Sequence, residues 1–208
     1  MDNKATTKAA HNAIAKQYYE AYKDDTYDLI FFDEFLSLCK GEILDLGCGM
    51  GHYSNYMFNK GFKVVGIDFS AEMIKIAKKL NSQIEFIEHD ICDLSIIENK
   101  TFDGVVIAYV LQHLSKVEVL NLFADLNKHT NQHSKLLLFL RQGNGIVTEE
   151  EPMNPKFKYI INEYSKDEIV NVLDVKGWKV VKIVDKEPVD DPNSLAPDTL
   201  VVMAEKNN

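Results

Sequence analysis

Short apolar runs alternate with amphipathic stretches along most of the 208 residues. The apolar runs predict buried strands, and the stretches whose apolar residues recur every three or four positions predict helices between them. This alternation is typical of an α/β protein with a mostly parallel sheet and helices on both faces. The predicted strands are Glu42–Leu46, Lys63–Ile67, Ile84–Ile87, Gly104–Ala108, Leu136–Leu140, Lys179–Val184 and Thr199–Ala204.

Helix start signals precede the amphipathic stretches. Ser70 is placed to cap a helix over Ala71–Leu80, because a serine hydroxyl accepts a hydrogen bond from a free N–H of the first turn. Ser115 precedes a second predicted helix, Lys116–Asn127, and Glu118 stands three residues after it. That spacing predicts a capping box, in which the side chains of the serine and the glutamate each accept a hydrogen bond from the backbone N–H of the other residue.

Two segments fall outside this alternation. Residues 1–40 have a helical pattern but precede the first strand, so we expect a helical cap over a sheet built by later residues. Residues 142–164 form a long connection that carries a run of three glutamates at 149–151. A connection of this length is a lid or substrate loop or holds extra strands, and Lys156–Glu163 fits a strand. A single domain over 1–208 follows from the length.

Composition limits the classes of function. The chain has 23 Lys and Arg against 32 Asp and Glu, a net charge of -9. This balance disfavours nucleic acid as a partner, because such proteins bind phosphates largely through basic side chains. No apolar run approaches the length of a membrane span. The three cysteines have neither a disulfide framework nor metal-ligand spacing, and no signal-peptide pattern is visible, so we expect a cytoplasmic protein without a bound metal.

Three glycines at alternate positions, Gly47, Gly49 and Gly51, follow the first predicted strand. Closely spaced glycines can take positive φ and let backbone N–H groups approach a ligand, and the next helix directs its N-terminus at the same point. A plain turn would need only one glycine. No Lys-Ser/Thr pair follows, which disfavours a nucleoside-triphosphate loop, and His52 occupies the sixth position of a dinucleotide fingerprint, where glycine is required.

Two acidic residues follow the next two predicted strands. Asp68 ends the second strand, where a carboxylate can accept both ribose hydroxyls, and the alternative role of helix cap already falls to Ser70. Asp90 follows the third strand beside Ile91, and an acidic acceptor next to an apolar wall suits an adenine ring with its amino group. Together with the glycine loop, these residues predict a nucleoside site at the carboxyl ends of three strands.

With these motifs the chain resembles the class I S-adenosylmethionine-dependent methyltransferases, particularly small single-domain enzymes that act on small molecules. The resemblance covers about residues 11–141 and rests on Asp45-x-Gly47-x-Gly49-x-Gly51, Val65–Ser70, Asp90, Phe102–Val106 and Leu111–Leu114. It implies a Rossmann-like, doubly wound sheet of seven strands in the order 3-2-1-4-5-7-6, the last antiparallel. The chain departs from the family in lacking a Pro-Gly-Gly turn at 131–134 and an Asn-Pro-Pro-Tyr-like motif after the fourth strand. The second absence further disfavours nucleic acid as the substrate.

The resemblance also implies S-adenosylmethionine as the cofactor and a set of residues that bind it: Tyr18, Asp45, Gly47, Gly49, Gly51, Asp68, Phe69, Asp90, Ile91 and Ala108. The glycines would pass under the methionine part, and Asp45 would orient the loop and the cofactor's amino group. Asp68 would hold the ribose, while Phe69 and Ile91 would contact the adenine ring. Asp90 would accept a hydrogen bond from the adenine amino group. The carbonyl of Ala108 would lie near the cofactor's ammonium, and Tyr18 would reach the cofactor from the N-terminal helix.

Methyl transfer from a sulfonium is an in-line displacement, so the protein mainly orients the acceptor and excludes water. A base is needed only where the acceptor must lose a proton. His113 and Tyr109, just after the fourth strand, are the candidate catalytic residues, and an ordinary histidine pKa near 6.5 suits proton transfer. For His113 the alternative is a place in the core or at the start of the next helix.

We therefore expect a methyltransferase that transfers a methyl group to an oxygen or nitrogen atom of a small-molecule acceptor. Two alternatives stay open. One is a non-catalytic or regulatory module that binds S-adenosylmethionine, and the other is an NAD-type dehydrogenase, which the loop spacing disfavours.

Overall fold

The computed structural model describes residues 3–186 and 198–207. Residues 1–2 of the expected cap, and residues 187–197 and 208 of the expected single domain, lie outside the described residues. The described helices are α1 Asn3–Tyr22, α2 Leu29–Leu38, α3 His52–Asn59, α4 Ala71–Leu80, α5 Lys116–Leu126 and α6 Lys166–Val175, with short 3-10 turns η1 Leu94–Ile97, η2 Leu111–His113 and η3 Asn127–His129. The strands are β1 Ile43–Leu46, β2 Val64–Asp68, β3 Glu85–Glu88, β4 Phe102–Ala108, β5 Thr130–Arg141, β6 Ile146–Glu150, β7 Lys158–Asn162, β8 Trp178–Lys186 and β9 Thr199–Lys206.

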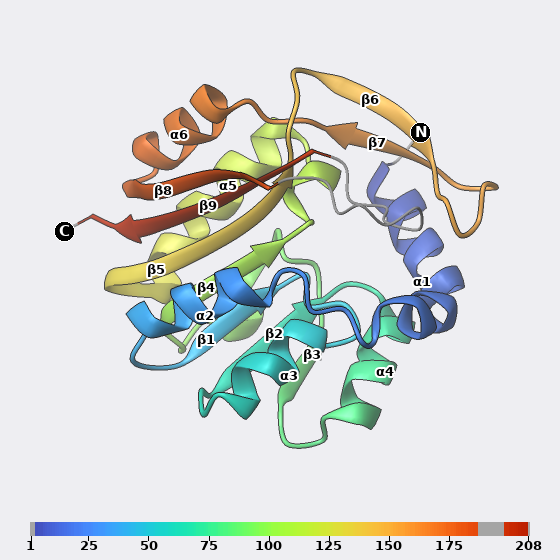
Figure 1. The fold of residues 1–208 in the computed structure, drawn as a ribbon, viewed down its shortest axis with the longest axis horizontal. Coiled ribbons are helices and arrows are strands. Elements are labelled where there is room, and N and C mark those ends of the chain that lie inside the picture. The colour runs from blue at the N-terminus through green and yellow to red at the C-terminus, as the bar shows by residue number, and fades with distance from the viewer. Residues whose placement is uncertain (1–2, 187–197, 208) are drawn as a thin grey trace.

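Seven of these strands form one twisted sheet in the order β3-β2-β1-β4-β5-β9-β8 (Figure 1). β1 to β5 pair in parallel, and β9 runs antiparallel to both of its neighbours, β5 and β8. Counted within the sheet alone, this order is 3-2-1-4-5-7-6, so the predicted topology is confirmed. The chain reverses its direction of travel across the sheet between β1 and β4, and ligands of open α/β sheets bind at the carboxyl ends of strands flanking such a reversal.

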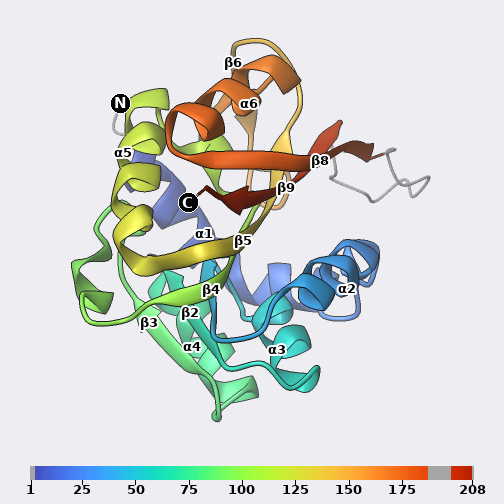
Figure 2. The same ribbon diagram turned by 90° about the vertical axis from the view of Figure 1, so that its left-hand side faces the viewer.

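Both faces of the sheet are covered by helices because successive side chains of a strand point to opposite sides. Leu44 and Leu46 belong to a core that α5 and α6 close, whereas Ile43 belongs to the core closed by α2, α3 and α4. Figure 2 shows α2 and α3 on the opposite side of the sheet from α5 and α6. Ser70 and Ser115 cap α4 and α5 as predicted, and the capping box with Glu118 is present.

The fifth strand is longer than the sequence indicated. β5 begins at Thr130 rather than Leu136, and residues 131–134 continue the strand with no separate turn, although His133 has a φ of 63°. The extra length follows from pairing of its polar start with β4, where Thr130 lies opposite Phe102 and the register shifts before Gly104. Ser134 donates to the carbonyl of Phe102 at 2.8 Å, which satisfies the backbone at this irregularity.

The long connection at 142–164 contains a two-stranded hairpin, β6–β7, and the strand predicted over Lys156–Glu163 is confirmed as β7. The hairpin stands beside α1 (Figure 1). Asn3 joins the two, because its Nδ2 donates to the carbonyl of Ile160 and its Oδ1 accepts from the Ile160 N–H, both at 3.0 Å. Thus α1 and the hairpin meet near the carboxyl ends of the parallel strands.

Candidate active site

The glycine loop between β1 and α3 takes positive φ at all three glycines: 79° at Gly47, 52° at Gly49 and 78° at Gly51. The Gly47 and Cys48 N–H groups donate to the Ile67 carbonyl at 2.7 and 3.0 Å, which ties the loop to β2. A Cβ at Gly47 would lie 2.1 Å from Val110 Cγ2, and one at Gly51 would lie 2.7 Å from the Phe86 ring. At Gly49 an added Cβ would meet no atom within 4 Å, so this glycine borders open space that a ligand can fill.

Asp45 is 1% exposed and holds the loop from within. Its Oδ2 accepts a hydrogen bond of 2.5 Å from the Ser54 hydroxyl, which joins β1 to the first turn of α3. Burial raises the pKa of Asp45 to about 7, and the nearby Asp68 charge raises it further against the opposing effect of the Ser54 hydroxyl. The structure thus places Asp45 as a support of the glycine loop, and its role toward a cofactor amino group stays a prediction.

Asp68 lies at the end of β2 with its carboxylate against the same loop. One oxygen accepts from the Gly49 N–H at 2.9 Å and the other from the Ser70 N–H at 2.8 Å. Burial raises the pKa of Asp68 from its ordinary value, although these hydrogen bonds oppose the rise. A carboxylate has about four acceptor positions, so two remain for the hydroxyls of a ribose. The two free acceptor positions of Asp68 and the open space at Gly49 fit the nucleoside part of the expected cofactor.

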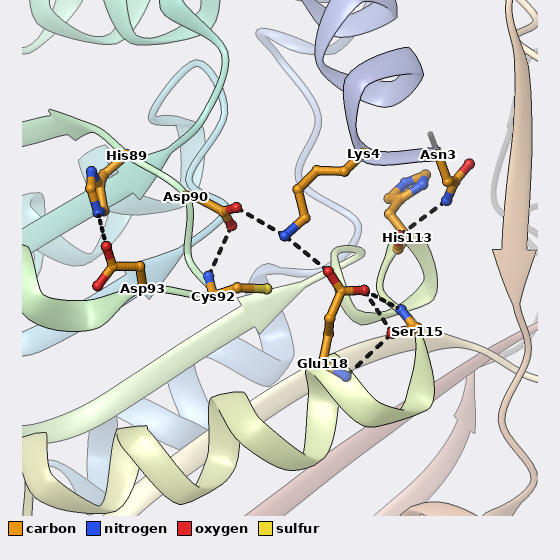
Figure 3. Close-up of polar contacts among 9 residues, drawn as sticks. All are labelled: Asn3, Lys4, His89, Asp90, Cys92, Asp93, His113, Ser115 and Glu118. Carbon is orange, nitrogen blue, oxygen red and sulfur yellow. Dashed lines mark hydrogen bonds and ion pairs between the residues drawn. The ribbon is translucent and has the colours of Figure 1, made fainter. Parts of the chain in front are cut away.

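Asp90 lies beyond β3, where α1 reaches it through Lys4 (Figure 3). Lys4 Nζ is 2.9 Å from Asp90 Oδ2 and 2.9 Å from Glu118 Oε1, and the Cys92 N–H donates to Asp90 Oδ1 at 2.9 Å. Burial raises the pKa of Asp90, but the hydrogen bonds from Lys4 and Cys92 outweigh it and hold the pKa below the ordinary value. Asp90 therefore stays ionised and keeps acceptor capacity for an adenine amino group.

A shallow surface recess lies beside Asp90 and is lined by Lys4, Ala5, Lys8, Phe69, Glu88, His89 and Asp90. Phe69 is thus exposed to the space that the prediction assigns to adenine. Ile91, which the same prediction placed against the ring, has its side chain in the core on the α5 and α6 face of the sheet.

Tyr109 follows Ala108 directly after β4 and has a φ of 61°, which is rare for a bulky residue. Its hydroxyl donates to Asp28 Oδ2 at 3.0 Å, and the Tyr53 hydroxyl donates to the same oxygen at 2.6 Å. Lys186 forms an ion pair with the other Asp28 oxygen. Burial and the Asp28 charge raise the pKa of Tyr109 far above its ordinary value, so the phenol stays protonated and serves as a hydrogen-bond donor.

His113 contacts a different set of residues from Tyr109. Its ring centroid lies 5.7 Å from that of His11 and 5.3 Å from that of Tyr159. The His113 Nδ1 atom is buried and has no hydrogen-bond partner among the described residues. Burial, with a smaller effect of His11, lowers the pKa of His113 to about 3, so the ring is neutral at pH 7 and has a free acceptor or donor position.

Helix α1 carries several residues into the site. The Tyr18 ring lies tilted against that of Tyr22, with centroids 4.6 Å apart, and packs on an apolar cluster that contains Met50 of the glycine loop. Asn12 Oδ1 accepts from the Ser70 hydroxyl at 2.8 Å and from the Glu72 N–H at 3.2 Å, which fixes α1 to the start of α4. The structure therefore brings Tyr18, the glycine loop and Asp68 to the same edge of the sheet.

The sequence pattern assigned no role to several residues of this edge: Lys4, Asn12, Asp28 and Lys186. Asn12 stands in the N-terminal stretch that resembles the family's covering helix, so its neighbourhood was visible in the sequence. The acidic and basic residues had no such signal, because a charged residue in a helix or loop is usually solvated. Among the described residues, no group of three or more His, Cys, Asp and Glu side chains is placed to hold a metal.

The fold and the glycine loop together define an α/β protein with a candidate nucleoside site at the carboxyl edge of its sheet. Residues 43–133 match the family model of a methyltransferase domain. An uncharacterized methyltransferase of Alkaliphilus oremlandii is 28% identical over 158 residues, which are 76% of this chain and 68% of that protein. Other curated methyltransferases match over less than half of their own length.

Solved structures agree with this assignment at the level of the fold. A SAM-dependent methyltransferase of Methanosarcina mazei has a TM-score of 0.75 at 21% identity, over 88% of this chain and 99% of that one. The 1,6-didemethyltoxoflavin-N1-methyltransferase of Burkholderia thailandensis, solved with 1,6-didemethyltoxoflavin and S-adenosylhomocysteine, has a TM-score of 0.75 at 15% identity, over 98% and 88%. The chain is thus similar to S-adenosylmethionine-dependent methyltransferases, in sequence over the matched domain and in fold over most of its length. No helix in the described part of the chain is long and apolar enough to cross a membrane.

Proposed function

We propose that this protein binds S-adenosylmethionine at the carboxyl ends of β1, β2 and β3 and transfers its methyl group to an oxygen or nitrogen atom of a small molecule. The observation that carries the proposal is the open space at Gly49 beside the Asp68 carboxylate. The N-methyltransferase of Burkholderia thailandensis, which shares the fold, was solved with a small-molecule ligand, and this supports an acceptor of that kind.

The residues of this chain would divide the work of binding. Asp68 would accept hydrogen bonds from the ribose hydroxyls, and Asp90 would accept one from the adenine amino group. Gly49 would let the backbone approach the methionine part of the cofactor. Tyr18 and the rest of α1 would cover the site and exclude water, which strengthens every electrostatic interaction inside it. When bound, S-adenosylmethionine supplies a methyl group on a positively charged sulfur whose departure as a neutral thioether is easy.

Orientation of the acceptor would fall to the residues after β4. The neutral ring of His113 can accept a hydrogen bond from an N–H or O–H of the acceptor at its unpartnered Nδ1. Its low pKa makes it a group that orients the acceptor rather than one that stores a proton. Tyr109, whose hydroxyl is engaged by Asp28, would form part of the wall on the α2 side.

The test is calorimetry with S-adenosylhomocysteine on the wild type and on Asp68→Ala. Loss of a carboxylate that holds two hydroxyls is expected to weaken binding by about 1.5–3 kcal/mol, roughly 10- to 150-fold. Asp174→Asn, an exposed position on α6, is the control and is expected to bind as the wild type does.

Unchanged affinity in Asp68→Ala would refute the ribose assignment. Tighter binding of NAD than of S-adenosylhomocysteine would point to the dehydrogenase alternative. Cofactor binding without turnover on a broad panel of metabolites would point to the regulatory alternative.

A further inference from the structure

The three glutamates at 149–151 make different contacts in the structure. Glu149 forms a paired contact with Arg141, at 2.7 Å for both oxygens, and Glu150 lies 3.1 Å from Lys158 Nζ. Glu151 is only 5% exposed, and no lysine or arginine within residues 3–186 and 198–207 forms an ion pair with it. A buried carboxylate without a positive partner is costly, so its surroundings need an explanation.

The Glu151 carboxylate is held by two donors. The Met153 N–H donates to Oε1 at 2.9 Å, and the Tyr159 hydroxyl of β7 donates to Oε2. These bonds fix the side chain without neutralising it, and each oxygen keeps a further acceptor position. Glu151 is thus a preorganised acceptor for one more donor or for a positive charge.

The tyrosine that bonds this carboxylate belongs to a small group of aromatic rings. The Tyr159 ring, whose hydroxyl is bonded to Glu151, lies 5.9 Å from His11 and 5.3 Å from His113, centroid to centroid. Burial raises the pKa of the Tyr18 phenol, and Tyr22, Asp25 and, after them, the charge of Glu151 raise it further. Burial lowers the pKa of both His11 and His113, so neither ring neutralises Glu151 at pH 7. Asp68 also acts on His11, but it faces the glycine loop.

On the basis of the proposed function, we infer that the methyl acceptor is an amine and that Glu151, set among Tyr159, His11 and His113, selects it. A carboxylate near aromatic rings is the combination that stabilises an organic cation, by ion pairing together with cation–π attraction. A neutral alcohol or an anion would leave the buried charge of Glu151 uncompensated. Glu151 is in this role a specificity-determining residue.

The chemistry of the step agrees with this selection. The bound ammonium first gives one proton to solvent. The resulting neutral amine forms the new N–C bond with its lone pair as the S–C bond of the sulfonium breaks, and the electron pair of that bond stays on sulfur. Positive charge moves from sulfur to nitrogen, and the methylated nitrogen later loses one proton to solvent. A carboxylate placed beside the nitrogen stabilises the charge that develops there, so Glu151 would act on the transition state as well as on binding.

The experiment uses the full chain saturated with S-adenosylhomocysteine and three probes of similar shape: phenethylamine, phenethyl alcohol and phenylacetate. Calorimetry or ligand-detected NMR gives their affinities for the wild type, for Glu151→Gln and for the matched control Glu150→Gln. We expect the wild type and Glu150→Gln to prefer the ammonium probe over the alcohol by about tenfold or more, and Glu151→Gln to lose that preference. Circular dichroism and the affinity for S-adenosylhomocysteine report whether each variant is folded.

Several results would overturn the inference. Measurements on the wild type alone would refute the inference if the alcohol or the carboxylate probe binds as tightly as the amine, or if the amine does not bind. A folded Glu151→Gln variant that keeps the full preference would show that Glu151 merely secures the turn between β6 and β7. Failure of the wild type to bind S-adenosylhomocysteine is measured separately and would refute the proposed function itself, whatever the probes do.

Discussion

At the scale of single residues, the three glycines of the loop serve different purposes. Gly47 and Gly51 leave no room for a Cβ, because Val110 and Phe86 pack against them. Gly49 combines positive φ with open space, so a side chain there would be accommodated by the protein but would enter the volume assigned to the cofactor. A single motif therefore contains two packing glycines and one binding glycine.

This division predicts the behaviour of two matched variants. Gly49→Ala is expected to remain folded, to lose about 1–2 kcal/mol of stability because φ is positive, and to weaken S-adenosylhomocysteine binding at least about tenfold. Gly61→Ala carries the same kind of strain, with φ of 95° and open space, outside the site. It is expected to lose stability without losing affinity. Urea unfolding and calorimetry measure the two quantities, and wild-type affinity in Gly49→Ala would show that the loop is only a turn.

At the scale of elements, α1 is attached to the rest of the molecule by polar contacts and by two small apolar clusters. Asn3 bonds β7, Lys4 bridges Asp90 and Glu118, and Asn12 bonds the start of α4. The Lys4 ion pairs are about one-third exposed, and such pairs contribute little, about 0–1 kcal/mol each. Only four residues of α1 are buried: Thr7, Ala10, Ile14 and Ala15. A helix held in this way opens at low cost.

Hydrogen exchange tests whether α1 closes over the cofactor. Amides of residues 10–22 are expected to exchange more slowly when S-adenosylhomocysteine is bound, because the ligand adds contacts that the free protein lacks. Helix α6 lies on the far face of the sheet and provides the internal comparison, with little expected change. Equal protection of residues 10–22 with and without ligand would mean that α1 is a packing helix and that closure depends on the β6–β7 hairpin.

At the scale of the whole molecule, the carboxyl edge of the sheet gathers buried titratable groups whose effects on stability oppose one another. His113 has a folded pKa of about 3, below the ordinary 6.5, so acid favours the unfolded chain between these values. Asp45 has a folded pKa of about 7, above the ordinary 3.8, so stability from this group is present in acid and is lost as the pH rises through 7. The contributions of His113 and Asp45 to folding stability therefore change in opposite directions with pH.

Unfolding free energies at several pH values separate these contributions. Between pH 7.5 and pH 5, the His113 contribution should cost the wild type about 1–2 kcal/mol, and His113→Gln should lack that loss. Asp45→Asn should instead lack the Asp45 contribution, which falls as the pH rises from 4 to 7, so its stability should increase more with pH over this range than that of the wild type. Identical pH slopes in the wild type and both variants would contradict the burial of these two groups.

The sequence alone predicted the strands, most of the helices and a nucleoside site, and its resemblance to a known family predicted the sheet order. Alternating apolar positions, serine caps and closely spaced glycines are local signals, because side-chain direction and backbone φ depend on neighbours within a few residues. Strand ends such as Asp68 and Asp90 then meet at one edge, since parallel strands place their carboxyl ends together. The extent of β5 was underestimated, because its polar start forms a strand only through pairing with β4.

Only the tertiary structure decided which charges are paired and which are not. Nothing in the run 149–151 distinguishes its three glutamates, yet one faces Arg141, one faces Lys158 and one is buried beside Tyr159. Partners such as Lys4 and Asp90 are 86 positions apart in the chain. Local propensity carries no information on such pairs, because burial and the charge of a neighbour arise when distant segments pack, and these set the chemistry of the site.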